Sequence, residues 1–157
     1  MAEILYDSIP SLDLADFTSG DPIRKARFVE QLGEAYNSIG FVAIRNHYLT
    51  DELTANLYST IKKFYAQPDQ IKQKYEIPGL AGQRGYIGKG KEHAKGRNTG
   101  DLKEFYHVGQ EVLDNDPIKK EYQDNVWTTE LPEFKKTALE VYKQLEKTGV
   151  QMLRAIA

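Results

Sequence analysis

The residues best suited to chemistry gather in a glycine-rich segment that runs from Gly79 to Glu104. Up to Gly100 it contains seven of the twelve glycines and five basic side chains against one acid, which gives a local charge of +4. The six charged residues are Arg84, Lys89, Lys91, Glu92, Lys95 and Arg97. Guanidinium and ammonium groups bind anions, and a long permissive loop is more often functional than idle. We therefore expect a flexible loop over residues 79–100 to carry function.

Metal chemistry in this chain would depend on its three histidines, because the sequence contains no cysteine. His47 is expected to be a turn residue that hydrogen-bonds the backbone, His93 to be solvated, and His107 to lie on a strand. A metal site needs two or three convergent ligands, and the sequence shows none at a recognisable spacing. We assign no metal-ligating and no catalytic residue to the chain.

Three charged residues, Asp101, Lys103 and Glu104, stand together where the glycine-rich segment ends. Two neighbouring acids could act as an acid and base pair, as in glycoside hydrolysis. Their position at the end of a long loop instead favours a structural task. We expect them to fasten the loop by hydrogen bonds and local ion pairs.

The first half of the chain is predicted to alternate strands and helices. Residues 9–14 read as a short edge strand, since they carry a proline near the start. Asp21 can cap a helix that has Pro22 at its first position, and Gly40 can end that helix in a left-handed turn. The continuous apolar run 41–44 predicts a buried strand covered on both faces.

The rest of the chain is predicted to hold one further strand and more helix. A helix begins at Thr50 or Asp51 and stops before Pro68, and one or two helical turns follow up to residue 75. Residues 104–109 have strand-like composition. An apolar stripe at helical spacing runs over 132–157 without a stop signal. We therefore expect the chain to be cut within this last helix.

Size and composition indicate one ordinary globular domain over residues 1–157. The chain has 40% apolar and 28% charged residues and a formal charge of −2, so any attraction for anions is local. The opening residues have no basic start and no apolar run of signal-peptide length, and no later run has the length of a membrane span. We expect a cytoplasmic protein.

The order of short motifs resembles the N-terminal region of the isopenicillin N synthase-like non-haem Fe(II), 2-oxoglutarate-dependent oxygenases. The motifs are Ile9-Pro10 with Leu12-Asp13, Gly40-Phe41, Asn46-His47, Gly85-Tyr86, Asp101 with Lys103-Glu104, and Asn125-Val126-Trp127 with Pro132 and Phe134. Two positions depart from the pattern. Thr128 stands where the bacterial members usually have proline, and Tyr48 where many members have glycine.

The resemblance implies an α+β fold, in which a helical and mixed N-terminal region precedes a double-stranded β-helix, the jelly-roll core. In the family, iron is held by a His-x-Asp pair and a distant histidine, and 2-oxoglutarate by an Arg-x-Ser pair. Neither motif occurs in this sequence. We therefore expect the core to be largely missing from this chain, the ligands of Fe(II) and 2-oxoglutarate to lie outside it, and a C-terminal jelly-roll half of the same protein to be its partner.

Arg84 and Tyr86 are the predicted substrate-binding residues. In the resembled family the segment around the Gly-Tyr pair lines or covers the substrate pocket, and an arginine there can hold a substrate carboxylate through a two-pronged hydrogen bond. The alternative is structural: Gly85 and Tyr86 begin a strand, the tyrosine packs, and Arg84 faces solvent.

The resemblance implies a part of an oxygenase that oxidises a small organic substrate, contributing scaffold and a pocket wall or lid. A second hypothesis is a non-catalytic binding module whose basic loop grips nucleic acid or a protein partner. Against it, Tyr86 is the one aromatic residue between Gly79 and Gly100, whereas stacking platforms carry several. Nucleic acid is therefore the less favoured partner.

Overall fold

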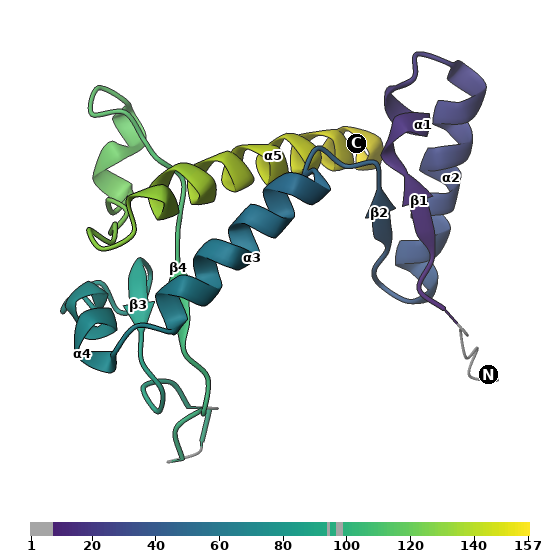
Figure 1. Cartoon of the computed structure of the whole chain (residues 1–157). Coiled ribbons are helices and arrows are strands. Elements are labelled where there is room, and N and C mark those ends of the chain that lie inside the picture. Colours follow the sequence, from purple (N-terminus) through teal and green to yellow (C-terminus); the bar gives the residue numbers. More distant parts are fainter. Residues whose placement is uncertain (1–7, 94, 97–98) are drawn as a thin grey trace. The chain divides into compact units, whose positions relative to one another are not determined.

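A computed structural model of the chain describes residues 8–93, 95–96 and 99–157 (Figure 1). The opening residues 1–7 and Arg97 of the basic loop, which the sequence analysis included, lie outside the described residues. Contacts divide the chain into two compact units. The first comprises the described residues up to Thr50 together with Lys143–Ala157, and the second is Asp51–Tyr142. Helices and strands are mixed, which confirms the α+β character of the predicted fold.

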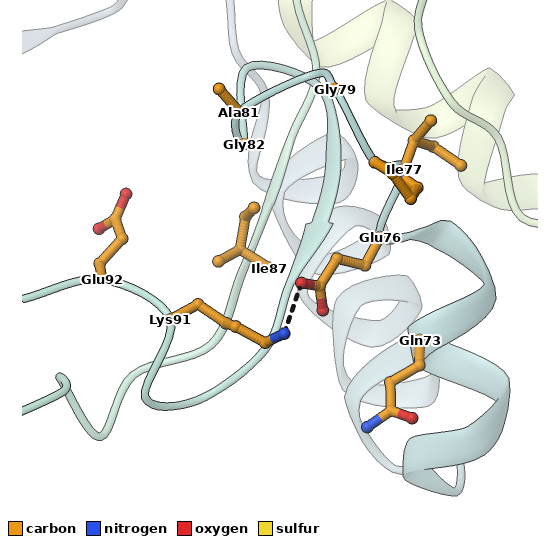
Figure 2. Close-up of a pocket in the computed structure, with 10 residues that line it drawn as sticks. Gln73, Glu76, Ile77, Gly79, Ala81, Gly82, Ile87, Lys91 and Glu92 are labelled. Carbon is orange, nitrogen blue, oxygen red and sulfur yellow. Dashed lines mark ion pairs between the residues drawn. The ribbon is translucent and has the colours of Figure 1, made fainter.

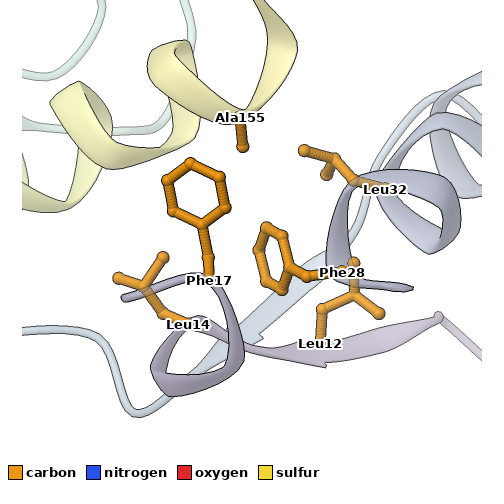
Figure 3. Packing of buried hydrophobic residues seen from close by; sticks show 6 residues of the cluster. All are labelled: Leu12, Leu14, Phe17, Phe28, Leu32 and Ala155. Atoms are coloured by element: carbon orange, nitrogen blue, oxygen red, sulfur yellow. The ribbon is translucent and has the colours of Figure 1, made fainter. Parts of the chain in front are cut away.

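The first unit builds a small sheet against helices. Its elements are β1 (Ser11–Asp13), α1 (Leu14–Thr18), α2 (Pro22–Ser38) and β2 (Ala43–Arg45). The two strands pair in parallel, with Leu12 opposite Ile44. Figure 3 shows the packed interior of this unit, to which β1, α1, α2 and the end of the last helix all contribute. Its buried residues are Leu12, Leu14, Phe17, Phe28, Leu32 and Ala155.

Helix α2 begins and ends where the sequence predicts. The Asp21 side chain accepts a hydrogen bond from the backbone N–H of Ile23 at 2.8 Å, which caps the helix, and Pro22 occupies the first turn. At the other end Gly40 has a φ of +86° and donates its N–H to the carbonyl of Ala35 at 3.2 Å. A left-handed residue in that position favours glycine, because it has no Cβ.

The prediction that residues 41–44 form a strand buried on both faces is wrong. The strand is β2, Ala43–Arg45, in which the two outer residues are exposed and only Ile44 is partly buried. Phe41 precedes it with 54% of its surface exposed. β2 has one partner strand among the described residues, and only Val42 and Ile44 pack on the core, so a single face is covered.

The second unit surrounds a short antiparallel hairpin with helices. Its strands β3 (Gly85–Ile87) and β4 (Phe105–His107) pair with Tyr86 opposite Tyr106. The elements that lie wholly within this unit are α3 (Asp51–Tyr65), α4 (Asp69–Lys72), the 3-10 turn η1 (Gln73–Tyr75), β3 (Gly85–Ile87), β4 (Phe105–His107) and a second 3-10 turn, η2 (Pro117–Glu121). The helical turns after Pro68 and the strand after Glu104 were both predicted from the sequence.

An aromatic cluster around Phe64 forms the core of this second unit. Phe64 is completely buried, and four further rings from separate elements lie around it. Their centroids are 5.0 Å from Phe64 for Tyr106, 5.6 Å for Phe134, 5.9 Å for Tyr86 and 6.2 Å for Tyr75. Tilted and edge-on rings at such distances attract one another beyond the area that they bury. Helix α3, the hairpin and the last helix are therefore tied to one side chain.

The last helix, α5, runs from Pro132 to Ile156, as the apolar stripe predicts. Its early stripe residues Phe134 and Val141 are buried, at 5% and 6% exposure. Later ones are open, with Leu145 at 53% and Ile156 at 58%. Within the described part of the chain, no helix combines the length and apolar character needed to cross a bilayer.

Replacing Phe64 with alanine should destabilise the protein by about 3–5 kcal/mol, because it leaves a cavity at the centre of the aromatic cluster. Tyr58 on the same helix is 61% exposed and gives the matched control. We expect Tyr58→Ala to change stability by less than about 1 kcal/mol. Urea unfolding of both variants measures the difference, and equal losses would contradict the assigned core.

Candidate functional site

The hairpin β3–β4 carries both residues that were predicted to bind substrate. Arg84 directly precedes β3, and Tyr86 is its central residue. Gly85 between them has a φ of +80°, and a Cβ there would lie 2.4 Å from the carbonyl oxygen of Tyr75. Only glycine allows the chain to pass this close to η1. The Gly-Tyr pair therefore begins a strand, as the structural alternative also required.

Tyr86 is buried, with 3% of its surface exposed. Its ring packs on Phe64, and its hydroxyl donates a hydrogen bond of 2.5 Å to Oε2 of Glu104. Burial, together with this bond to a carboxylate, raises the pKa of Tyr86 to about 12. The tyrosine is therefore neutral at pH 7 and acts as a hydrogen-bond donor inside the unit.

Lys72 shares the same acceptor and is the least expected member of the site. It is only 4% exposed, and its Nζ lies 2.7 Å from Glu104 Oε2 and 3.0 Å from Asp69 Oδ1. The hydrogen bond from Lys72 to Glu104 is the main cause of a raised lysine pKa, and it outweighs the opposing effect of burial. A buried ammonium group keeps its charge when such partners surround it. Lys72 is therefore a fixed cation behind the hairpin.

Glu104 is the centre of this polar cluster, since it accepts from both Lys72 and Tyr86. Burial alone would raise the pKa of its carboxyl group, but the hydrogen bonds from Lys72 and Tyr86 and the charges of Lys72 and Lys89 lower the pKa below the ordinary value of 4.5. The Nζ of Lys89 lies 3.9 Å from Oε1 of Glu104. The carboxylate joins α4, β3 and the residue just before β4.

Arg84 is half-buried and has no carboxylate partner among the residues that the structure describes. Its Nη1 donates to the carbonyl oxygen of the neighbouring Gln83 at 2.7 Å. Its Nε is shielded from solvent and finds no hydrogen-bond partner within the described chain. An unpaired buried donor is costly, and the described residues place no carboxylate against the charge of this guanidinium.

A pocket of about 700 Å³ lies beside the hairpin (Figure 2). Ile87 of β3 lines it together with Gly79, Ala81 and Gly82, and two further lining residues, Lys91 and Glu76, pair at 3.1 Å. Arg84 and Tyr86 do not line this pocket. The structure therefore separates the predicted substrate-binding pair from this pocket.

The end of the glycine-rich loop is fastened as the sequence predicts. Lys103 pairs with Glu92 at 2.9 Å and with Asp101 at 3.4 Å. The backbone of Asp101 accepts from the N–H of Gly90 at 2.8 Å and donates to the carbonyl of Glu92 at 2.7 Å. Because two other loop lysines also face carboxylates, the loop is less cationic than its sequence suggests. This pairing does not favour a phosphate-binding surface.

The histidines do not converge on a metal site. His47 accepts a hydrogen bond from the N–H of Leu49 at 3.2 Å, in the turn role predicted for it. The His107 Nδ1 lies 2.6 Å from the carbonyl oxygen of Gly82, and His93 is exposed. Nowhere in residues 8–93, 95–96 and 99–157 do three histidine or acidic side chains gather as a metal would require. These residues do not fit an iron centre.

Sequence reasoning missed the burial of Lys72 and the central position of Glu104. The only local signal for Lys72 is the spacing of three residues from Asp69, which suits a helical ion pair. Its main partner Glu104 is 32 residues away, so no periodicity connects the two.

Comparisons with known proteins point to one family. A family model described as non-haem dioxygenase in morphine synthesis N-terminal matches residues 9–130. A 2-oxoglutarate-dependent dioxygenase from Dothideomycetidae sp. is 32% identical over 157 residues, which cover 96% of this chain and 47% of that protein.

Solved structures agree with this assignment. A 2OG-Fe(II) oxygenase family protein from Caulobacter crescentus superimposes with a TM-score of 0.81 at 31% identity, over 96% of this chain and 48% of that one. A full-length Neurospora crassa protein in complex with alpha-KG gives a TM-score of 0.78 at 25% identity, over 99% and 49%. The chain spans about half the length of these three relatives.

Replacing Glu104 with glutamine should destabilise the protein by about 3 kcal/mol at neutral pH, because Lys72 would lose its main counter-charge. The folded pKa of Glu104 is lowered, so its carboxylate stabilises the fold above the ordinary pKa of 4.5. That contribution is lost as the pH falls through the lowered folded value. Urea unfolding between about pH 3 and pH 7 measures this effect. The free energies of unfolding of the wild-type protein and of Glu104→Gln should approach each other as the pH falls.

The control for this prediction is Glu92→Gln. Glu92 is 49% exposed and pairs with an exposed lysine, so its loss should cost less than about 1 kcal/mol at any pH. Equal effects of the two substitutions would contradict the central position of Glu104.

Proposed function

The chain belongs to the family of non-haem dioxygenase N-terminal regions, as its motifs indicated, and from this premise we propose that it forms the N-terminal part of an Fe(II)- and 2-oxoglutarate-dependent oxygenase. The whole enzyme would oxidise a small organic substrate. The observation that carries the proposal is the family match over residues 9–130, supported by structural likeness to one half of known oxygenases. A cytoplasmic location stays a prediction.

In this proposal the chain supplies scaffold and one wall or lid of the substrate pocket. The jelly-roll core would be the C-terminal half of the same protein, and it would provide the ligands of Fe(II) and 2-oxoglutarate. The described residues offer no fitting set of metal ligands. The sequence also lacks the His-x-Asp and Arg-x-Ser motifs that the family uses. Residues 1–157 would then act as one N-terminal region.

Arg84 is the residue that we assign to the substrate. In the described chain its guanidinium donates to the neighbouring Gln83 carbonyl and not to a carboxylate, and a planar carboxylate matches the donors of a guanidinium group. Tyr86 belongs to the same wall, two residues further along the hairpin. Its hydroxyl is bonded to Glu104, so a direct substrate contact would require it to exchange that partner.

The isolated chain should not turn over. When mixed with Fe(II), 2-oxoglutarate and oxygen, it should form no succinate above the protein-free blank, because its described residues cannot assemble an iron site. Mass spectrometry of the reaction mixture measures succinate directly. Succinate formation by the pure chain would contradict the assignment of the Fe(II) and 2-oxoglutarate ligands to the C-terminal half.

In the intact oxygenase, Arg84→Ala should raise the KM for a carboxylate-bearing substrate by about tenfold or more, equivalent to about 1.4 kcal/mol. Lys89→Ala is the control, since this loop lysine is 65% exposed and should leave KM unchanged. Steady-state kinetics distinguishes the two variants. An unchanged KM for Arg84→Ala would end its assignment to the substrate.

A further inference from the structure

Gly109, two residues beyond β4, leaves space that Arg84 occupies. A Cβ built on Gly109 would lie 2.2 Å from both Cζ and Nη2 of Arg84 and 2.5 Å from its Nε. Side-chain Cβ atoms do not approach other heavy atoms below 3.0 Å. The φ of Gly109 is outside the left-handed region, so its backbone does not demand glycine. A side chain at this position would therefore have to displace the guanidinium group.

Asn125 fixes the backbone against which that guanidinium rests. The N–H of Gly109 donates to Oδ1 of Asn125 at 2.8 Å, and Nδ2 of Asn125 donates to the carbonyl oxygen of Gly109 at 2.9 Å. A two-way amide contact of this kind satisfies both polar groups of one residue and orients them. The surface beneath Arg84 is therefore held from a segment 16 residues away.

The guanidinium on this surface is held without a counter-charge among the described residues. Nη1 is occupied by the Gln83 carbonyl, while Nε is shielded from solvent and lacks an acceptor in the described chain. Leaving a buried donor unpaired is unfavourable. A bound carboxylate would instead neutralise a cation that is already oriented, so little further ordering would be needed.

We propose that Gly109 and Asn125 are positioning residues that seat the Arg84 guanidinium for a carboxylate group of the substrate. This inference rests on the proposed function and extends it from one residue to three. It implies that a side chain at position 109 displaces Arg84 while sparing the fold, because the atoms that it meets are the flexible end of an arginine. A substitution at position 109 should therefore change substrate binding without changing stability.

Labelling of the full-length oxygenase with phenylglyoxal, an arginine reagent, tests whether Gly109 and Asn125 position the Arg84 guanidinium. It requires no substrate. Peptide mass spectrometry reads each arginine separately, and the exposed Arg45 serves as the internal reference. Gly109→Ala should raise the labelling rate of Arg84 and leave that of Arg45 unchanged, since the displaced guanidinium becomes more accessible to the reagent. Equal rates of Arg84 labelling in wild type and Gly109→Ala would overturn the proposal.

Gly88→Ala is the matched control on the same hairpin. A Cβ at Gly88 would meet its nearest atom at an ordinary 3.6 Å, so the labelling of Arg84 should not change. Asn125→Ala removes both bonds to Gly109 and should also speed labelling, which keeps the test decisive if Gly109→Ala folds poorly. Labelling could depend on Gly109 while Arg84→Ala leaves KM unchanged. In that case Gly109 and Asn125 do position Arg84, and only the assignment of Arg84 to the substrate is wrong.

Discussion

A buried lysine must keep its counter-charge, and in the second unit Lys72 meets this constraint mainly through Glu104, with the exposed Asp69 as a second partner. Glu104 accepts from Lys72 at 2.7 Å and from Tyr86 at 2.5 Å, so α4 and the hairpin share a single acceptor. Neither donor has room to turn to water, since Lys72 is 4% and Tyr86 3% exposed. Removal of Glu104 would leave the buried charge of Lys72 without its main counter-charge, which costs more than the pair itself contributes.

The position of Arg84 follows from this constraint. The Tyr86 ring is fixed by Phe64 on one side and its hydroxyl by Glu104, so the strand that begins at Gly85 cannot slide. A shift of one residue would turn Tyr86 away from the core. Arg84 is thereby held at the start of β3, where its guanidinium lies over Gly109.

Local signals in the sequence were sufficient for the elements but not for their contacts. Asp21 with Pro22 and the stripe starting at Pro132 predicted where two helices begin, because caps and periodicity act within a few residues. The burial of Lys72 could not be predicted, since its partner is distant in sequence. The prediction that residues 41–44 are buried on both faces was wrong because a continuous apolar segment indicates burial without indicating which surface covers it.

In the proposed function, the hairpin held by Glu104 would present Arg84 to a substrate, and the oxidising centre would lie outside the described residues. The most direct test of this account is to sequence the coding region downstream of the codon for Ala157. The account predicts a His-x-Asp pair, a later histidine and an Arg-x-Ser pair in the same reading frame. A stop codon immediately after Ala157 would contradict it.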